Sequence, residues 1–130
     1  MEKVSRGNIE MSWDPEARLA FLSFKEKTRA TGPDAEALVS ALSSWLGEDG
    51  KPFALLGDGS KLGAVDAEYR AIWGQFFRKH RDDSFIAFFN MNAIVRVAAD
   101  MFGIGIGLRL KGFAREQEAR DWLRKNGIPA

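Results

Sequence analysis

Near the start of the chain, apolar and polar residues alternate with the period of a β-strand. Ile9, Met11 and Trp13 are apolar and their neighbours are polar. A proline-bearing stretch at 14–18 follows, and then a second apolar run at 19–24. Two such runs joined by a short turn predict an antiparallel hairpin.

A helical spacing replaces this alternation after residue 31. Between 33 and 47 the apolar residues recur every three to four positions, with a proline suited to the first turn and Gly47 suited to the C-terminal cap. The segment 66–81 repeats the pattern. It begins with acidic residues and ends with basic ones, as the helix dipole favours.

Two short apolar runs, 52–56 and 84–89, have the form of strands buried on both faces. A mostly apolar helix is predicted over 94–102, an edge strand over 108–111 and a last helix over 116–125. The predicted order is therefore β-β-α-β-α-β-α-β-α. It describes an α/β domain with a mixed, mostly parallel sheet that opens with an antiparallel hairpin, since parallel neighbours need helical crossovers.

The composition narrows the function classes. The chain has 130 residues and no linker-like stretch, which predicts a single domain over 1–130. Its 19 Lys and Arg nearly balance its 18 Asp and Glu, so no strong field favours nucleic acid. It has no cysteine, which fits a cytoplasmic location, and no apolar run approaches the roughly 20 residues of a membrane span. No cofactor and no metal are expected.

The predicted order and two stretches resemble the SpoIIAA-like, or STAS, fold, and especially its stand-alone bacterial STAS/SEC14-type members. The stretches are "FIAFFNMNAIVRVAADMF", a buried strand followed by an apolar helix with an arginine, and "KGFAREQEARDWLRKNG", a strand followed by an acidic helix start and Ala-x-x-Trp-Leu. The resemblance implies a regulatory or partner-binding module without chemistry of its own. Some STAS domains are anti-anti-sigma factors switched by serine phosphorylation, and others are tied to nucleotide or lipid recognition.

The resemblance also points to Ser60, which follows Asp58 and Gly59 in "LLGDGSKLGAVDAEY". Anti-anti-sigma factors carry Asp-Ser-x-Gly with the serine at the start of a helix, whereas here Lys-Leu-Gly follows the serine. Ser60 is a candidate phospho-switch, and the alternative is a serine in a glycine turn. A phosphate there would lie near Lys61 and a helix N-terminus.

Two loops follow the strands at 52–56 and 84–89. Open α/β sheets bind ligands at the carboxyl ends of their strands, so these loops predict one polar rim for a partner or ligand. A metal held by Asp58 and Asp66 is an alternative, but no second acidic motif supports it. The candidate residues besides Ser60 are Gly57, Asp58, Gly59, Lys61, Asn90, Met91 and Asn92.

The helix at 94–102 is apolar on more than one face, which predicts self-association through Met101 and Phe102. The glycines at 103, 105 and 107 have the start of a dinucleotide fingerprint. They follow a helix and open a strand, however, so a helix cap and tight connection is the better interpretation. His80 lies at a basic helix end and is expected to cap the helix and not to act as a general base.

These features predict a non-enzymatic regulatory or protein-interaction module, expected to be a homodimer with a protein partner that the sequence does not identify. The alternative is a carrier of a small ligand, a lipid or a nucleotide, held between an apolar helix and the sheet. An enzyme would need a paired nucleophile and base, a metal cluster or a phosphate loop in the right context, and the sequence shows none of these.

Overall fold

A six-stranded mixed sheet forms the centre of the computed structural model, which describes residues 2–25, 28–91 and 107–130. The first three strands of the sheet pair antiparallel, and the remaining pairs are parallel, as the sequence predicts. The strands, in their order across the sheet, are β1 (Glu2–Arg6), β2 (Ile9–Asp14), β3 (Leu19–Phe24), β5 (Phe53–Asp58), β7 (Ser84–Phe89) and β8 (Leu110–Gly112).

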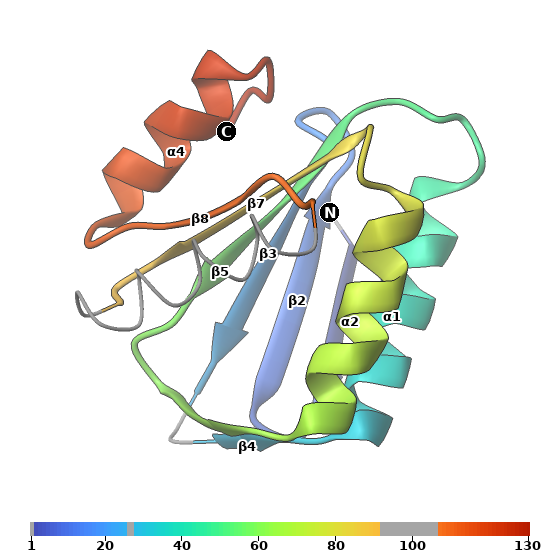
Figure 1. Cartoon of the computed structure of the whole chain (residues 1–130), viewed down its shortest axis with the longest axis vertical. Coiled ribbons are helices and arrows are strands. Elements are labelled where there is room, and N and C mark those ends of the chain that lie inside the picture. Colours follow the sequence, from blue (N-terminus) through green and yellow to red (C-terminus); the bar gives the residue numbers. More distant parts are fainter. Residues whose placement is uncertain (1, 26–27, 92–106) are drawn as a thin grey trace.

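Helices cover both faces of this sheet (Figure 1). Helices α1 (Gly32–Leu46) and α2 (Ala67–Lys79) pack against each other on one face, and α4 (Glu116–Lys125) lies on the other. Each face has its own apolar core. Trp13, Leu38 and Phe53 belong to the core under α1 and α2, and Leu56 and Leu123 belong to the core under α4. The central strands β5 and β7 contribute to both cores, which explains their continuous apolar sequences.

Local sequence signals explain where the helices begin and end. Thr31 precedes α1, and its backbone N–H and its hydroxyl both donate to the Asp34 carboxylate, at 3.0 and 2.9 Å. Such a contact satisfies groups that the first helical turn leaves unpaired. Gly47 ends α1 with a φ of 65°, in the left-handed region that glycine adopts at no steric cost.

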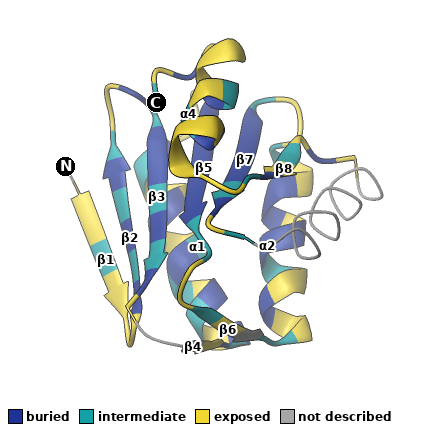
Figure 2. Cartoon of the chain, turned by 90° about the vertical axis from the view of Figure 1, so that its left-hand side faces the viewer, coloured by how far each residue is buried: buried dark blue, intermediate teal, exposed yellow. Residues whose placement is uncertain are grey.

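The structure contains three strands that the sequence does not predict. β1 has exposed residues at four of its five positions, so it shows no apolar alternation (Figure 2). β4 (Thr28–Ala30) and β6 (Leu62–Val65) are very short, and they pair with each other in a separate two-stranded parallel sheet. β8 is an edge strand as predicted, but it begins two residues later than the alternation suggests. The helix predicted at 94–102 lies outside the described residues.

Among the described residues, no helix is both long and apolar enough to cross a membrane.

Candidate functional site

The loops after β5 and β7 lie side by side at the carboxyl ends of these parallel strands. Asp58, the last residue of β5, stands in register with Phe89, the last residue of β7. The Gly59 N–H donates to the Phe89 carbonyl oxygen at 2.9 Å, which holds the first loop against the end of β7. We call these two loops, together with the last two residues of β5, the rim. It comprises Gly57, Asp58, Gly59, Ser60, Lys61, Asn90 and Met91.

The Asp58 carboxylate ties the two loops together. Its Oδ1 accepts hydrogen bonds from the Ser60 backbone N–H at 2.9 Å and from Asn90 Nδ2 at 3.0 Å. Asn90 has a φ of 60°, a left-handed conformation that asparagine adopts more readily than most residues do. The Asn90 N–H also donates to the Ala114 carbonyl oxygen at 3.2 Å. Three segments of the chain therefore meet at this end of the sheet.

The contacts of Asp58 favour its charged form. Partial burial is the largest single influence and raises the pKa of this carboxyl, because burial penalises the charge. The hydrogen bonds from Ser60 and Asn90 together with the nearby Lys61 ammonium outweigh it, and the pKa lies below its ordinary value of 3.8. Asp58 is therefore ionised at neutral pH, where it accepts both hydrogen bonds.

Ser60 and Lys61 are both exposed on the rim. The sequence predicts that a phosphate on Ser60 would lie near a helix N-terminus, but β6 lies between Ser60 and the start of α2 at Ala67. Ser60 is thus not in the first turn of a helix, in contrast to the serine of the anti-anti-sigma pattern. Its neighbour Lys61 remains the nearest cation in the sequence.

Two glycines let the strands and loops of the rim approach closely. A Cβ at Gly57 would collide with the ring of Phe88 on the neighbouring strand β7. A Cβ at Gly59 would lie 3.1 Å from Met91 Cγ and 3.2 Å from the Phe89 carbonyl oxygen. Gly57 therefore leaves room for the Phe88 ring, a Cβ at Gly59 would be tightly packed, and neither glycine has a left-handed φ.

An apolar cavity of about 630 Å³ lies beside the rim, between the sheet and α2. Met91 belongs to both the rim and the wall of the cavity, so the two features share a border. The volume falls in the range of small-molecule sites, which are mostly apolar with a few polar groups. The described residues that line it are Leu22, Phe24, Leu55, Leu62, Val65, Tyr69, Arg70, Trp73, Gly74, Phe77, Ile86, Phe88, Met91, Leu108 and Leu110.

Two aromatic residues of α2, Tyr69 and Trp73, line this cavity. Burial raises the pKa of the Tyr69 phenol to about 12, so the hydroxyl stays protonated. The Trp73 indole packs edge-on against Tyr69 with 6.4 Å between ring centroids. The buried Trp73 Nε1–H has no hydrogen-bond acceptor among the described residues.

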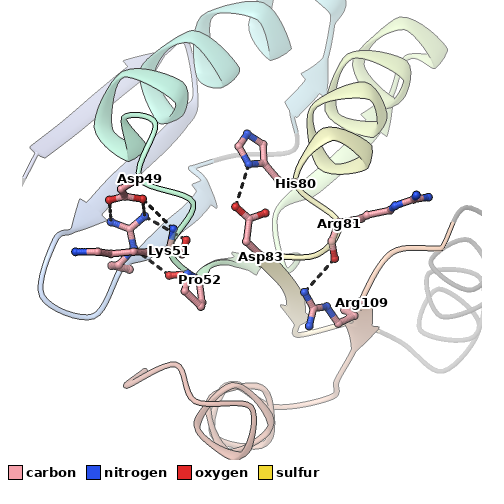
Figure 3. A network of polar contacts seen from close by, with 8 residues as sticks. Asp49, Lys51, Pro52, His80, Arg81, Asp83 and Arg109 are labelled. Atoms are coloured by element: carbon pink, nitrogen blue, oxygen red, sulfur yellow. Dashed lines mark hydrogen bonds and ion pairs between the residues drawn. The ribbon is translucent and has the colours of Figure 1, made fainter.

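The contacts of His80 stabilise the C-terminal end of α2. It caps the C-terminus of α2, where its backbone N–H donates to the carbonyl oxygens of Phe76 and Phe77. Its Nδ1 lies 3.4 Å from Asp83 Oδ2 (Figure 3). Its ring packs against Phe76 with centroids 4.7 Å apart. The structure therefore places His80 at the helix end where the sequence predicts a cap.

The described residues contain no group of three or more His, Cys, Asp or Glu that could hold a metal ion. Asp66, the second candidate for a metal at the rim, instead pairs with Arg29 Nη2 at 2.8 Å.

Several sequence predictions fall outside the described residues. These are the rim candidate Asn92, the dimer candidates Met101 and Phe102, and the glycines at 103 and 105. Gly107 is described, with a φ of 73° in an exposed turn before β8. The carrier alternative places a ligand between an apolar helix and the sheet, but the sequence does not predict which residues line such a cavity. The helical spacing of Tyr69, Trp73 and Phe77 indicates only an apolar face.

Comparisons with known proteins agree with this architecture. The family model described as SpoIIAA-like matches residues 21–124. No curated protein matches the chain. Among solved structures, an uncharacterised protein with a SpoIIAA-like fold from Shewanella loihica is 16% identical with a TM-score of 0.68, and the match covers 94% of this chain and 90% of that one.

Two further solved structures share the fold. An anti-sigma-factor antagonist (STAS) domain protein from Planctomyces limnophilus is 14% identical with a TM-score of 0.60, covering 88% of this chain and 96% of that one. The murine anion transporter Solute Carrier 26 family member A9 is 17% identical with a TM-score of 0.57, covering 83% of this chain and 18% of that one. The order of strands and helices and the family match lead to one conclusion: the chain belongs to the SpoIIAA-like family.

Proposed function

We propose that the chain is a single non-enzymatic domain that binds a partner protein through the rim and acts as a regulatory module. The observation that carries this proposal is the double contact of Asp58 with Ser60 and Asn90, which orders an exposed polar surface. The family supports it, since STAS-like domains are associated with protein interaction and anti-sigma-factor antagonism.

Order in the rim favours binding for a physical reason. A loop that is already held in one conformation loses less conformational freedom when a partner docks. The Asp58 contacts and the Gly59 hydrogen bond to β7 supply this order, while the side chains of Ser60 and Lys61 remain exposed for recognition.

Capture of partners from the natural host tests the proposal. Wild-type protein and an Asp58→Ala/Asn90→Ala variant serve as baits, and Asp82→Ala is the matched control, because Asp82 is an exposed carboxylate before β7. We expect a protein that wild type and Asp82→Ala retain and the double variant loses. Equal capture by all three baits would assign partner binding to another surface.

Ser60 offers a regulated form of the same interaction. A phosphate there would add negative charge next to Lys61 and alter the surface that the partner meets. Ser60→Asp is expected to change partner affinity without changing the free energy of unfolding, because the side chain is exposed. Identical affinity of Ser60→Asp, Ser60→Ala and wild type for the captured partner would argue against the switch.

A second candidate function is favoured by the cavity. We propose as the alternative a carrier of a small, mainly apolar ligand, because apolar side chains from the sheet and α2 line almost all of the cavity. Burial of apolar ligand surface against these side chains would contribute to affinity.

Native mass spectrometry of protein purified from its host distinguishes the two candidates. A carrier shows a reproducible additional mass of a few hundred daltons, a size that fits the cavity. Gly74→Leu should abolish this mass, since Gly74 lines the cavity and a Cβ there meets no atom within 4 Å. Gln75→Leu on the exposed side of α2 is the control. Wild type without bound mass would count against the carrier.

The proposal includes a cytoplasmic homodimer. The segment predicted to carry the interface, with Met101 and Phe102, lies outside the described residues.

A further inference from the structure

The outer strand β1 presents an open edge. Among the described residues it is the first strand in the order of the main sheet and pairs only with β2, and its side chains are exposed at all positions except Val4. Its pairing is regular over all five residues, without a bulge or proline. Figure 2 shows β1 at the margin of the sheet, with no described element beyond it. Such an edge is a template for another strand.

The register shows which main-chain groups face outward. The Lys25 N–H donates to the Asn8 carbonyl oxygen at 2.8 Å, so the even-numbered residues of β2 direct their main-chain groups toward β3. The odd-numbered ones therefore face β1, where Met11 stands opposite Val4. By the same alternation, the N–H and C=O groups of Lys3 and Ser5 point to the open edge.

We propose that two copies of this chain associate by antiparallel pairing of β1 with β1, across a twofold axis at Val4. In this register Lys3 of one chain exchanges main-chain hydrogen bonds with Ser5 of the other, and Val4 faces its own copy. Glu2 stands opposite Arg6 of the other chain, twice by symmetry. The two main sheets then continue into one.

Charge selects this register over its neighbours. Residues whose main-chain groups point to the open edge must pair with residues of the same kind. The two strands can therefore shift only so that the residue on the twofold axis changes from Val4 to Lys3 or Ser5. Centring on Lys3 opposes two ammonium groups, which destabilises the pair, and centring on Ser5 places Val4 opposite a guanidinium. Only the Val4-centred register overlaps all five residues and opposes Glu2 to Arg6.

The charged side chains of β1 do not block this edge. Lysines on edge strands usually prevent pairing, but Lys3 Nζ already lies 3.4 Å from Glu10 Oε1 of the neighbouring strand. Arg6 contacts Asp34 of α1 through Nε alone, at 3.2 Å, and its side chain remains 48% exposed. Its terminal nitrogens are therefore accessible to Glu2 of the other chain, and Glu2 has no ion pair among the described residues.

A single strand pair is a small interface, so the dimer should be reversible and concentration-dependent. Light scattering across a concentration series should show the mass rising from the 14.5 kDa of one chain toward twice that value. Glu2→Arg and Arg6→Glu should each weaken self-association by about tenfold, since each opposes like charges twice. An equimolar mixture of the two variants should restore the dimer, because opposite charges then face each other.

The control variant for these charge changes is Asp82→Arg, an exposed site before β7 that should leave dimerisation unchanged. A monomer at every concentration would overturn the proposal. A dimer that survives both charge reversals, or a mixture that fails to restore association, would also overturn it.

Cross-linking tests the axis itself, and the chain helps because it has no native cysteine. Val4 residues facing each other in a non-hydrogen-bonded pair have Cα atoms about 4.5 Å apart, within disulfide range. Val4→Cys should therefore cross-link under mild oxidation, whereas Ser5→Cys should not, since its two copies lie more than about 7 Å apart. Equal cross-linking of both variants would exclude the Val4 axis. Circular dichroism confirms that each variant is folded.

Discussion

At the residue scale, Asp58 makes the rim sensitive to pH. A carboxyl whose pKa is lower in the folded than in the unfolded chain stabilises the fold at pH values above its unfolded pKa. This stabilisation is lost as pH falls through the pKa of the folded chain. Despite partial burial, hydrogen bonds from Ser60 and Asn90 and the nearby Lys61 hold the pKa of Asp58 below 3.8 in the folded chain. The contribution of Asp58 to the free energy of unfolding is therefore complete at neutral pH and is lost only below about pH 4.

Asp58→Ala should therefore lower the free energy of unfolding at pH 7 by about 1–2 kcal/mol, because the Ser60 N–H and the Asn90 amide lose their acceptor. The difference from wild type should shrink as pH falls below 4. Urea unfolding at several pH values measures it. Ser60→Ala keeps the backbone hydrogen bond to Asp58 and loses only the side-chain one, so its loss should be smaller than that of Asp58→Ala. A difference that is constant down to pH 2.5 would contradict the assignment.

A second residue-scale prediction compares two glycines. Gly57→Ala should destabilise the fold by about 1–3 kcal/mol, since its Cβ would collide with Phe88. Gly74→Ala in α2 meets no atom within 4 Å and should be neutral or stabilising by up to about 1 kcal/mol. Thermal unfolding of both variants measures the contrast, and Gly57→Ala/Phe88→Leu should recover part of the loss. Equal stability of the two alanine variants would refute the close packing of the Phe88 ring on Gly57.

At the element scale, Arg18 joins the β2–β3 turn to the segment between α1 and β5. Its guanidinium makes two contacts with the Asp49 carboxylate, at 3.1 and 3.0 Å, and donates to the carbonyl oxygens of Lys51 and Pro52 (Figure 3). Its φ of 54° is unfavourable for a residue with a side chain. The contacts hold this turn in place despite the cost of that conformation.

Replacing Arg18 separates the two effects. Arg18→Ala should lose about 1–3 kcal/mol, because it removes the contacts and keeps the unfavourable φ. Arg18→Gly removes the same contacts but accepts the φ, so it should be about 1 kcal/mol more stable than Arg18→Ala. Urea unfolding of the three proteins tests this order. A glycine variant less stable than the alanine variant would show that the left-handed φ carries no cost.

The elements also show what can be predicted from sequence. Ile9, Met11 and Trp13 alternate because one face of β2 is buried, so the hairpin was predictable. β1 was not, since Val4 is its sole apolar residue and its position depends on pairing with β2. The rim could be placed because both loops follow strong strand signals. The cavity could not, because its walls combine β3, α2 and β8, and no local pattern encodes that combination.

At the scale of the whole molecule, β1 is peripheral to the fold and central to the proposed dimer. A chain that starts at Gly7 keeps β2 through β8 and the buried residues of both cores, and it loses the packing of Val4 on the first core and the Arg6–Asp34 contact. We expect it to fold with slightly lower stability and to stay monomeric at concentrations where the full chain dimerises. Circular dichroism and light scattering measure the two properties. An unfolded product, or an unchanged dimer, would contradict this division of roles.

The parallel pairing of β3 with β5 also affects how the chain is made. A ribosome releases β1, β2 and β3 first, and the free edge of β3 has no partner until α1 and then β5 have been synthesised. Pairing between strands distant in the sequence is slow, and unpaired apolar strands aggregate. The nascent chain therefore passes through a stage in which β3 is exposed, and chaperone binding is most useful to it during that interval.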